Sequence, residues 1–312
     1  MRATGTLVTE VKVAPSDDSG AREPYPLRLL KSFLLFARSE LRVFIFVVAI
    51  AASYLIASGL KPNLLDFALL LTSGYLLSLG VYALNDYTDI EEDIINSPTR
   101  PLPSGAIRRR DAKVLILILL IAAPIIGSLI SITTGALYVA TVFLGIAYSY
   151  PRIHAKRRFP DKMLVSGAGY TTFTLAGGAA AQNLNPTIFF AAVSFTLFGM
   201  VTLLLGDIAD YKGDSAAGVK SLAVVVGPQR AVWITTMIPL VIGILGVMFF
   251  KMVNFNMLFP LVLVSLSIYS ILTIHRLVRK YDDPAEVRRA KSRLRFIHFA
   301  LQVSFVIGLL VI

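Results

Sequence analysis

The feature that most constrains this chain is a series of long apolar stretches that carry no charged side chain. A helix needs about 20 consecutive apolar residues to cross the hydrocarbon core of a bilayer. Seven stretches reach or approach that length: 43–60, 67–85, 114–150, 165–206, 231–250, 252–274 and 296–312. Only 16% of the 312 residues are charged, against about a quarter in soluble domains. The sequence therefore predicts an all-α, polytopic membrane protein.

Two of these stretches are long enough to contain two helices each. Turn-forming residues interrupt 114–150 near 131–135 and 165–206 near 183–186. The second helix of each pair is either a full span or a re-entrant segment. With both divided, the chain has about nine transmembrane helices, which we expect to form a bundle around a central cavity. Glycine and alanine gather in 167–181, which predicts close helix packing or room for a lipid chain.

The basic residues fall on one side of this layout. Of 30 Lys and Arg residues, 28 lie in the N-terminal segment and in alternate loops, and only Lys61 and Lys251 lie opposite. The positive-inside rule then predicts an integral cell-membrane protein with its N-terminus and charged loops in the cytoplasm. This distribution explains the net charge of +11 by topology. We therefore expect membrane lipid, and no nucleic acid, as a partner.

The N-terminal residues differ in composition from the remainder of the chain. Residues 1–25 are mostly polar and are predicted to be a disordered tail, without the short apolar core and cleavage site of a signal peptide. Residues 26–42 resemble an amphipathic helix at the membrane surface. We expect 26–312 to form a single transmembrane domain. Cysteine is absent, which excludes disulfides, thiolate metal sites and a cysteine nucleophile.

Two acidic motifs with the same spacing lie at the predicted cytoplasmic ends of two spans. The first reads N-D-x-x-D-x-x-x-D from Asn85 to Asp93, and the second reads D-x-x-D-x-x-x-D from Asp207 to Asp214. Positions i, i+3 and i+7 share one face of a helix, so each motif should present its aspartates as one stripe. Each aspartate recurs 121 residues later, which suggests an internal repeat of about four helices.

The spacing of these carboxylates points to metal-assisted chemistry on a diphosphate. Three like charges near hydrocarbon are costly unless cations offset them. Carboxylate oxygens suit Mg²⁺, which commonly bridges to substrate phosphates and neutralises a leaving group as its bond breaks. Ordinary acidic residues past a helix end are the alternative, but two identical patterns argue against it. The predicted metal ligands, whose aspartates are also the predicted catalytic residues, are Asn85, Asp86, Asp89, Asp93, Asp207, Asp210 and Asp214.

The motifs and the residues that follow them resemble the UbiA family of intramembrane prenyltransferases. R-P-L-P-S-G at 100–105 and G-V-K-S-L at 218–222 follow the two motifs, as in that family. Ser221 and Ala223 stand where family members often have Thr and Pro. The resemblance implies Mg²⁺-dependent transfer of a prenyl group from a prenyl diphosphate, in the geranyl to geranylgeranyl range, to a lipophilic acceptor, with release of pyrophosphate.

Basic residues near the motifs are candidates for direct contact with the diphosphate. Arg100 and Lys220 follow the motifs closely enough to fold back over them, Arg as a bidentate ligand and Lys as a point charge. The loop 148–158 resembles a third family region that carries a tyrosine and a basic residue. The predicted substrate-binding residues are Asn85, Arg38, Arg100, Tyr148, Arg152, Lys156 and Lys220. Each basic residue also has a simpler interpretation as a topology signal.

The resemblance leaves the acceptor open. The first motif is slightly more similar to the archaeal branch, the digeranylgeranylglyceryl phosphate synthases, whose acceptor is geranylgeranylglyceryl phosphate. The stretch 213–222 is equally similar to branches that prenylate aromatic acids or chlorins, such as chlorophyll synthase. An ion or proton transporter is an alternative from another class, although its carboxylates would lie near the bilayer midplane and these lie at span ends.

Overall fold

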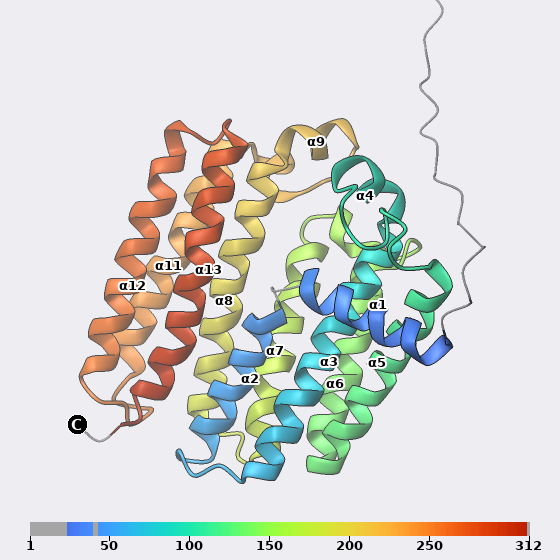
Figure 1. Cartoon of the computed structure of the whole chain (residues 1–312). Helices are drawn as coiled ribbons and strands as arrows, with labels where there is room; N and C mark the ends of the chain where they lie inside the picture. The colour runs from blue at the N-terminus through green and yellow to red at the C-terminus, as the bar shows by residue number, and fades with distance from the viewer. Residues whose placement is uncertain (1–23, 40–42, 311–312) are drawn as a thin grey trace, which may run out of the picture.

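The computed structural model describes residues 24–39 and 43–310, and the elements of this part are helices (Figure 1). The nine long helices are α2 Val43–Ala57, α3 Leu64–Thr88, α5 Arg109–Ile130, α6 Ile132–Ser149, α7 Asp161–Ala180, α8 Pro186–Ala209, α11 Pro228–Phe249, α12 Leu258–His275 and α13 Pro284–Ile307. The shorter elements are α1 Tyr25–Ser39, α4 Ile90–Asn96, η1 Ala155–Arg157, α9 Tyr211–Ala216, α10 Leu222–Val226 and η2 Arg276–Arg279. Most of the predicted tail, residues 1–23, lies outside the described part.

Both double-length stretches divide where the turn-forming residues predict. Ser131 separates α5 from α6, and its Oγ accepts a hydrogen bond of 3.0 Å from the Thr134 amide. Asn185 caps α8 in the same way, because its Oδ1 accepts a hydrogen bond of 3.1 Å from the Ile188 amide. Pro186 takes the first helical position of α8. α6 and α8 have 18 and 24 residues, so both are long enough to cross a bilayer as full helices, which favours full spans over re-entrant segments.

Six described helices are long and apolar enough to cross a membrane: α3, α5, α6, α8, α11 and α12. The other three long helices differ for separate reasons. α2 is strongly apolar but has only 15 residues, α7 is rich in glycine, alanine and threonine, and α13 begins with several basic residues. All three pack against other long helices, since α2 contacts α7 and α13, and α7 and α13 both contact α8.

The nine long helices form a closed ring in chain order. Each packs against the next, from α2 through α3, α5, α6, α7, α8, α11 and α12 to α13, and α13 returns to α2. Contacts between α2 and α7 and between α8 and α13 cross the ring. Figure 1 shows α4 and α9 at one end of the bundle and the C-terminal end of α13 at the other.

The predicted amphipathic helix is present as α1, which lies across the outside of α3 and α5 (Figure 1). Phe36 is fully buried in a cluster that includes Leu79 and Leu115. Nε of Arg28 lies 3.4 Å from the buried Asp111 carboxylate of α5. α1 is therefore held to the bundle by apolar burial and by the ion pair between Arg28 and Asp111.

The small residues of α7 permit close approach to α2, as their composition predicts. A Cβ added to Gly177 would lie 2.5 Å from the Ile50 carbonyl oxygen and 2.8 Å from the Ser53 Cβ. Ala176 and Ala180, on the same helix, are buried. By contrast, a Cβ on Gly169 would meet no atom within 4 Å. The contact between α2 and α7 therefore depends on glycine at position 177.

We predict that Gly177→Ala destabilises the protein and that Gly169→Ala does not. Both changes gain the same helix propensity, about 1 kcal/mol. The new methyl at 177 must displace the backbone of α2, and overpacking of this kind costs about 1–3 kcal/mol. Thermal unfolding in detergent should show a lower midpoint for Gly177→Ala alone. Equal midpoints for the two variants would contradict the close packing of α2 on α7.

Candidate active site

The two aspartate motifs occupy equivalent places at the same end of the bundle. The first begins in the last turn of α3 and ends in α4, and the second begins in the last turn of α8 and ends in α9. Figure 1 shows α4 and α9 at this end, each bent away from the axis of the long helix before it. The spacing of the sequence motif is thus repeated as a structural motif of long helix, bend and short helix.

The prediction of one continuous stripe on one helix is wrong at the middle aspartate of each motif. Asp89 ends α3 and precedes α4, with φ −100° and ψ 7°. Asp210 lies between α8 and α9 with nearly the same angles, φ −98° and ψ 5°. The bend separates the last aspartate of each motif from the axis of the long helix before it.

Arg100 joins the first and last carboxylates of the first motif. Its Nη1 donates to Asp86 at 3.0 Å and to Asp93 at 2.7 Å. Asp86 is only 2% exposed and Asp93 8%, so both carboxylates need a cationic partner. The prediction that Arg100 folds back over its motif is therefore confirmed.

The loop after the first motif explains why Arg100 reaches back. Leu102 and Ile107 are buried in the apolar cluster that also contains Ile90 of α4. The Ile107 amide donates to the Pro101 carbonyl at 3.0 Å, and the Ser104 amide to the Arg100 carbonyl at 3.0 Å. Two apolar anchors and a hydrogen-bonded turn hold the arginine in place.

Lys156 of η1 reaches the middle of the first motif. Its Nζ forms an ion pair with Asp89 and lies 3.5 Å from the Asn85 side-chain oxygen. Asn85 in turn donates to Asp89 at 3.1 Å and accepts from Ser149 of α6 at 3.4 Å. The first motif, the end of α6 and the following loop therefore share one polar network.

Lys162 plays the corresponding part at the second motif. It lies in the first turn of α7 and pairs with Asp207, whose side chain is buried. Asp210 is exposed and lies 3.7 Å from Arg288 of α13. Burial raises the pKa of the Asp214 carboxyl above its ordinary value, with Lys162 opposing this and Asp207 and Asp210 adding to it. The second motif is thus more open than the first.

The loop between α6 and α7 connects the two motifs. The Phe159 amide donates to the Lys220 carbonyl at 2.7 Å, and the Lys220 amide donates to the Arg157 carbonyl at 2.9 Å. This short bridge fixes the loop to the segment after the second motif. Tyr148, at the end of α6, lies within electrostatic range of Asp89, Lys162 and Asp207. Tyr148 is therefore close to charged groups of both motifs, as its predicted role requires.

For three of the predicted substrate-binding residues, the described part of the structure gives no side-chain contact with this network. Arg152 and Lys220 are exposed, and Lys220 is tied to the loop only through its backbone. Arg38 lies in the last turn of α1, and its side chain is outside the described part of the structure. The roles of these three residues stay predictions.

Lys162 is the site residue that the sequence analysis missed. Its place after Lys156, Arg157 and Arg158 is typical of a basic residue that sets topology. The sequence does contain a signal for a paired lysine, since Lys162 directly precedes an uncharged stretch of about 40 residues. A lysine at such an entry point is commonly paired.

The donor atoms of the two motifs fit Mg²⁺ in kind but do not form a complete cage. They are carboxylate and amide oxygens, which suit this ion, and Mg²⁺ in such sites needs only one or two carboxylates together with substrate phosphates. Among the described residues no group of three His, Asp or Glu side chains is close enough to hold a metal by itself. Arg100, Lys156 and Lys162 instead neutralise the carboxylates. The site suits ions that arrive with a diphosphate.

Comparisons with known proteins agree on one family. The model of the UbiA prenyltransferase family matches residues 45–300. A digeranylgeranylglyceryl phosphate synthase of Korarchaeum cryptofilum is 34% identical over 235 residues, which cover 73% of this chain and 78% of that protein.

Solved structures resemble the fold over nearly its whole length. A structure described as that of digeranylgeranylglyceryl phosphate synthase in membranes has a TM-score of 0.73 and 23% identity, covering 90% of this chain and 98% of the other. A UbiA homologue from Archaeoglobus fulgidus, bound to GPP and Mg²⁺, has a TM-score of 0.65 and 17% identity, covering 90% and 100%. At these identities the likeness bears on the fold alone.

We predict that Arg100→Met takes one cationic partner from two buried carboxylates, Asp86 and Asp93, and lowers stability by about 2–4 kcal/mol. We expect a value near the lower end of this range, because Arg100 is 30% exposed and water screens part of its interaction with the carboxylates. Adding Asp86→Asn should restore part of the stability, since it neutralises the more deeply buried of the two carboxylates that lose Arg100. Unfolding of detergent-solubilised protein without Mg²⁺ measures both.

The matched control for this pair is Arg157→Met. Arg157 lies 3.9 Å from Glu92, and both side chains are exposed, so the loss should stay below about 1 kcal/mol. Equal losses for Arg100→Met and Arg157→Met would refute the buried network.

Proposed function

This chain belongs to the UbiA prenyltransferase family, and we propose that it transfers a prenyl group from a prenyl diphosphate to geranylgeranylglyceryl phosphate. Prenyl transfer in a membrane is the activity of the family, so the alternative hypothesis of an ion or proton transporter is rejected. The donor lies in the geranyl to geranylgeranyl range. The observation that supports this most is that two equally bent aspartate motifs lie at one end of the bundle, tied together by the α6–α7 loop.

The carboxylates and cations have separate roles in binding the diphosphate. Asn85 and the six motif aspartates would hold Mg²⁺, which would supply positive charge to the diphosphate and make pyrophosphate a better leaving group. Arg100, Lys156 and Lys162, which pair with these carboxylates, turn toward phosphate oxygens when the donor binds. Lys220, which follows the second motif, adds positive charge, and Arg38 is a further predicted contact.

The reaction exchanges one carbon–oxygen bond for another. The bond between C1 of the prenyl group and the diphosphate oxygen breaks, and the pair of electrons leaves with pyrophosphate. The allylic cation that forms is stabilised by the ring of Tyr148, which is near both motifs. A hydroxyl oxygen of the acceptor attacks C1, and its proton is released.

The acceptor assignment rests on similarity and on charge. The relative with 34% identity is a digeranylgeranylglyceryl phosphate synthase, and an acceptor that carries a phosphate requires cations beyond those that bind the donor. Arg152 and Arg157, on the α6–α7 loop, provide them. Aromatic acids and chlorins carry a carboxylate of lower charge than a phosphate and would need fewer cations.

The orientation follows from the charge distribution. The motif end of the bundle, with its basic loops, faces the cytoplasm, and residues 26–312 act as one transmembrane domain after a disordered tail of residues 1–25. The 121-residue offset supports an internal repeat of about four helices, because α3 and α4 begin at Leu64 and Ile90 and α8 and α9 begin at Pro186 and Tyr211.

We predict that Asp93→Asn and Asp214→Asn each reduce pyrophosphate release by about 100-fold or more, the usual loss when one electrostatic stabiliser of a leaving group is removed. Chelation of divalent ions should abolish release, and Mg²⁺ should restore it. The control is Glu91→Gln, an exposed acid between two motif aspartates, which should keep nearly full activity. Unaltered release in both Asn variants would refute the assignment of the two motifs.

The acceptor is tested with detergent-solubilised protein, Mg²⁺ and labelled geranylgeranyl diphosphate. Geranylgeranylglyceryl phosphate, homogentisate, 4-hydroxybenzoate and chlorophyllide are offered in parallel, and products are identified by mass. We expect the glycerol phosphate lipid to be prenylated at least tenfold faster than the others, and Arg152→Gln to raise its KM. Preferential prenylation of an aromatic acid or of chlorophyllide would overturn the acceptor while leaving the family activity intact.

A further inference from the structure

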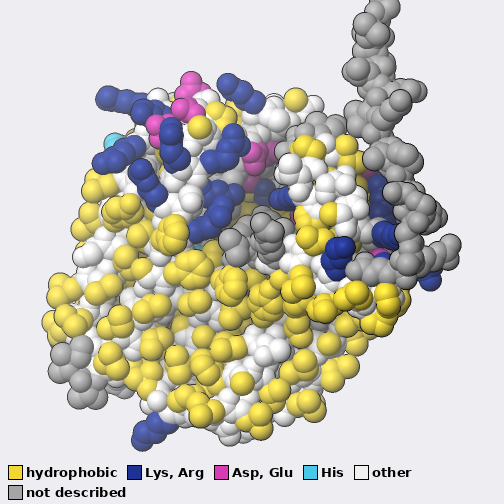
Figure 2. Space-filling model, in the orientation of Figure 1, with side chains coloured by type: hydrophobic (Ala, Val, Ile, Leu, Met, Phe, Trp, Pro, Cys, Tyr) yellow, Lys and Arg dark blue, Asp and Glu magenta, His cyan; other side chains and the backbone are white. Residues whose placement is uncertain are grey.

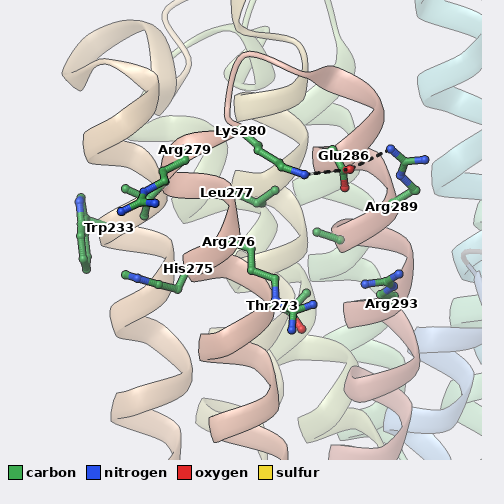
Figure 3. A pocket seen from close by; sticks show the side chains of 12 residues that line it. Trp233, Thr273, His275, Arg276, Leu277, Arg279, Lys280, Glu286, Arg289 and Arg293 are labelled. Carbon is green, nitrogen blue, oxygen red and sulfur yellow. Dashed lines mark ion pairs between the residues drawn. The ribbon is translucent and has the colours of Figure 1, made fainter.

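A basic pocket lies between α11, α12, η2 and α13, apart from the aspartate motifs. It is a cavity of about 800 Å³. Figure 3 shows its side chains, which come from the end of α12, from η2 and from the first turns of α13. Five of the side chains that line it are basic and one is acidic: Arg276, Arg279, Lys280, Arg289, Arg293 and Glu286.

The charge of this pocket is only partly balanced. Glu286 pairs with Lys280 at 3.6 Å and with Arg289 at 3.1 Å, and these pairs are drawn in Figure 3. Arg276, Arg279 and Arg293 form no ion pair with any carboxylate in the described part of the chain. Three guanidinium groups are therefore available to an anion.

The pocket faces away from the proposed active site. α13 directs Arg288 toward Asp210 of the second motif, and Lys291 lies beside Gly206, where an added Cβ would be 2.7 Å from its Nζ. Arg289 and Arg293 lie on the other face of the same helix and line the pocket. One helix thus serves the second motif with one face and the basic pocket with another.

An apolar groove leads along α11 and α12 on the outside of the bundle. It has a volume of about 320 Å³. Its lining residues are Leu240, Gly243, Ile244, Val247, Met248, Val264, Ser267, Ile268 and Ile271. Leu240, Ile244 and Ile268 are each more than 40% exposed, so this groove is open to the hydrocarbon of the membrane.

Helical spacing connects the groove to the basic pocket. Trp233 precedes Leu240 by two turns of α11, and His275 follows Ile271 by one turn of α12, so both continue the groove-lining faces. Trp233 and His275 both line the basic pocket, and their rings pack edge to face at 5.3 Å. The distance along α11 from Trp233 to Met248 is about 22 Å, longer than the roughly 15 Å of hydrocarbon in one leaflet.

We propose that this pocket and groove together bind one anionic phospholipid, with its phosphate among Arg276, Arg279 and Arg293 and a hydrocarbon chain between α11 and α12. The charge of the pocket matches the phosphate, which arginine binds bidentately. The groove matches the chain, and a tryptophan lies at the junction, where aromatic side chains meet the membrane–water interface. Figure 2 shows Lys and Arg side chains gathered at one end of the molecule above a hydrophobic band, the arrangement that such a lipid requires.

The headgroup half is tested on the purified full-length protein in detergent. The probes are phosphatidylglycerol, phosphatidylcholine and inorganic phosphate, and retention is measured by native mass spectrometry and by the shift in unfolding temperature. We expect phosphatidylglycerol to be retained in preference to phosphatidylcholine. Neutralising one arginine should weaken this binding about fivefold, and the triple variant Arg276→Gln, Arg279→Gln, Arg293→Gln by roughly 100-fold.

The matched control removes three charges elsewhere. Arg108, Arg109 and Arg110 are exposed at the start of α5, so the triple Gln variant there changes net charge equally without touching the pocket. It should retain phosphatidylglycerol as the unaltered protein does. An equal loss in both triple variants would mean general electrostatic attraction and would overturn the site.

The second test concerns the hydrocarbon chain of the lipid and fills the groove that is proposed to bind it. Ile268→Phe places a larger side chain in it, and Ile121→Phe makes the same change at a similarly exposed position of α5, which does not line the groove. Ile268→Phe alone should weaken phosphatidylglycerol binding several-fold. If inorganic phosphate gave the full stabilisation and Ile268→Phe had no effect, the pocket would bind a free phosphate and the lipid assignment would be wrong.

Discussion

The burial of carboxylates near hydrocarbon is the constraint on which the rest of this structure depends. Asp86 and Asp207 are each 2% exposed at the ends of apolar helices. An unpaired charge in such a place is costly, so cations must come from elsewhere in the chain. Arg100 comes from the loop after α4, Lys156 from η1 and Lys162 from the first turn of α7. These pairs determine how the loops at this end fold over the bundle.

In the function proposed above, the same pairs prepare the site for its substrate. A diphosphate with its Mg²⁺ presents anionic oxygens to the lysines and arginine and cations to the carboxylates. Groups that neutralise one another without substrate can therefore each find a partner when it binds. The bend at Asp89 and at Asp210 adds to this, since it places the last carboxylate of each motif beside the loops and not beyond the helix end.

The basic residues of α13 lie on two different faces of the helix. The face with Arg288 and Lys291 supports the second motif, and the face with Arg289 and Arg293 lines the basic pocket. A lipid held at that pocket would contact α11, α12 and α13 together. It would thereby stabilise the half of the ring that carries the second motif, in the membrane from which a lipophilic acceptor arrives.

The sequence by itself determined the elements that depend on local composition. The apolar stretches, the turn formers at Ser131 and Asn185 and the repeated aspartate spacing predicted the nine long helices and the two motifs, because each signal acts over a few turns. The position of Arg100 was also predictable, since only seven residues separate it from Asp93.

Only the tertiary structure decided which distant groups meet. The pairing of Lys162 with Asp207 joins residues 45 positions apart, and the bridge between Phe159 and Lys220 joins two loops. The bends at Asp89 and Asp210 and the convergence of arginines on one pocket depend likewise on how whole helices pack. Spacing along a chain defines the faces of one helix. It does not define which face of a neighbouring helix lies opposite, because that is set by the packing of the complete ring.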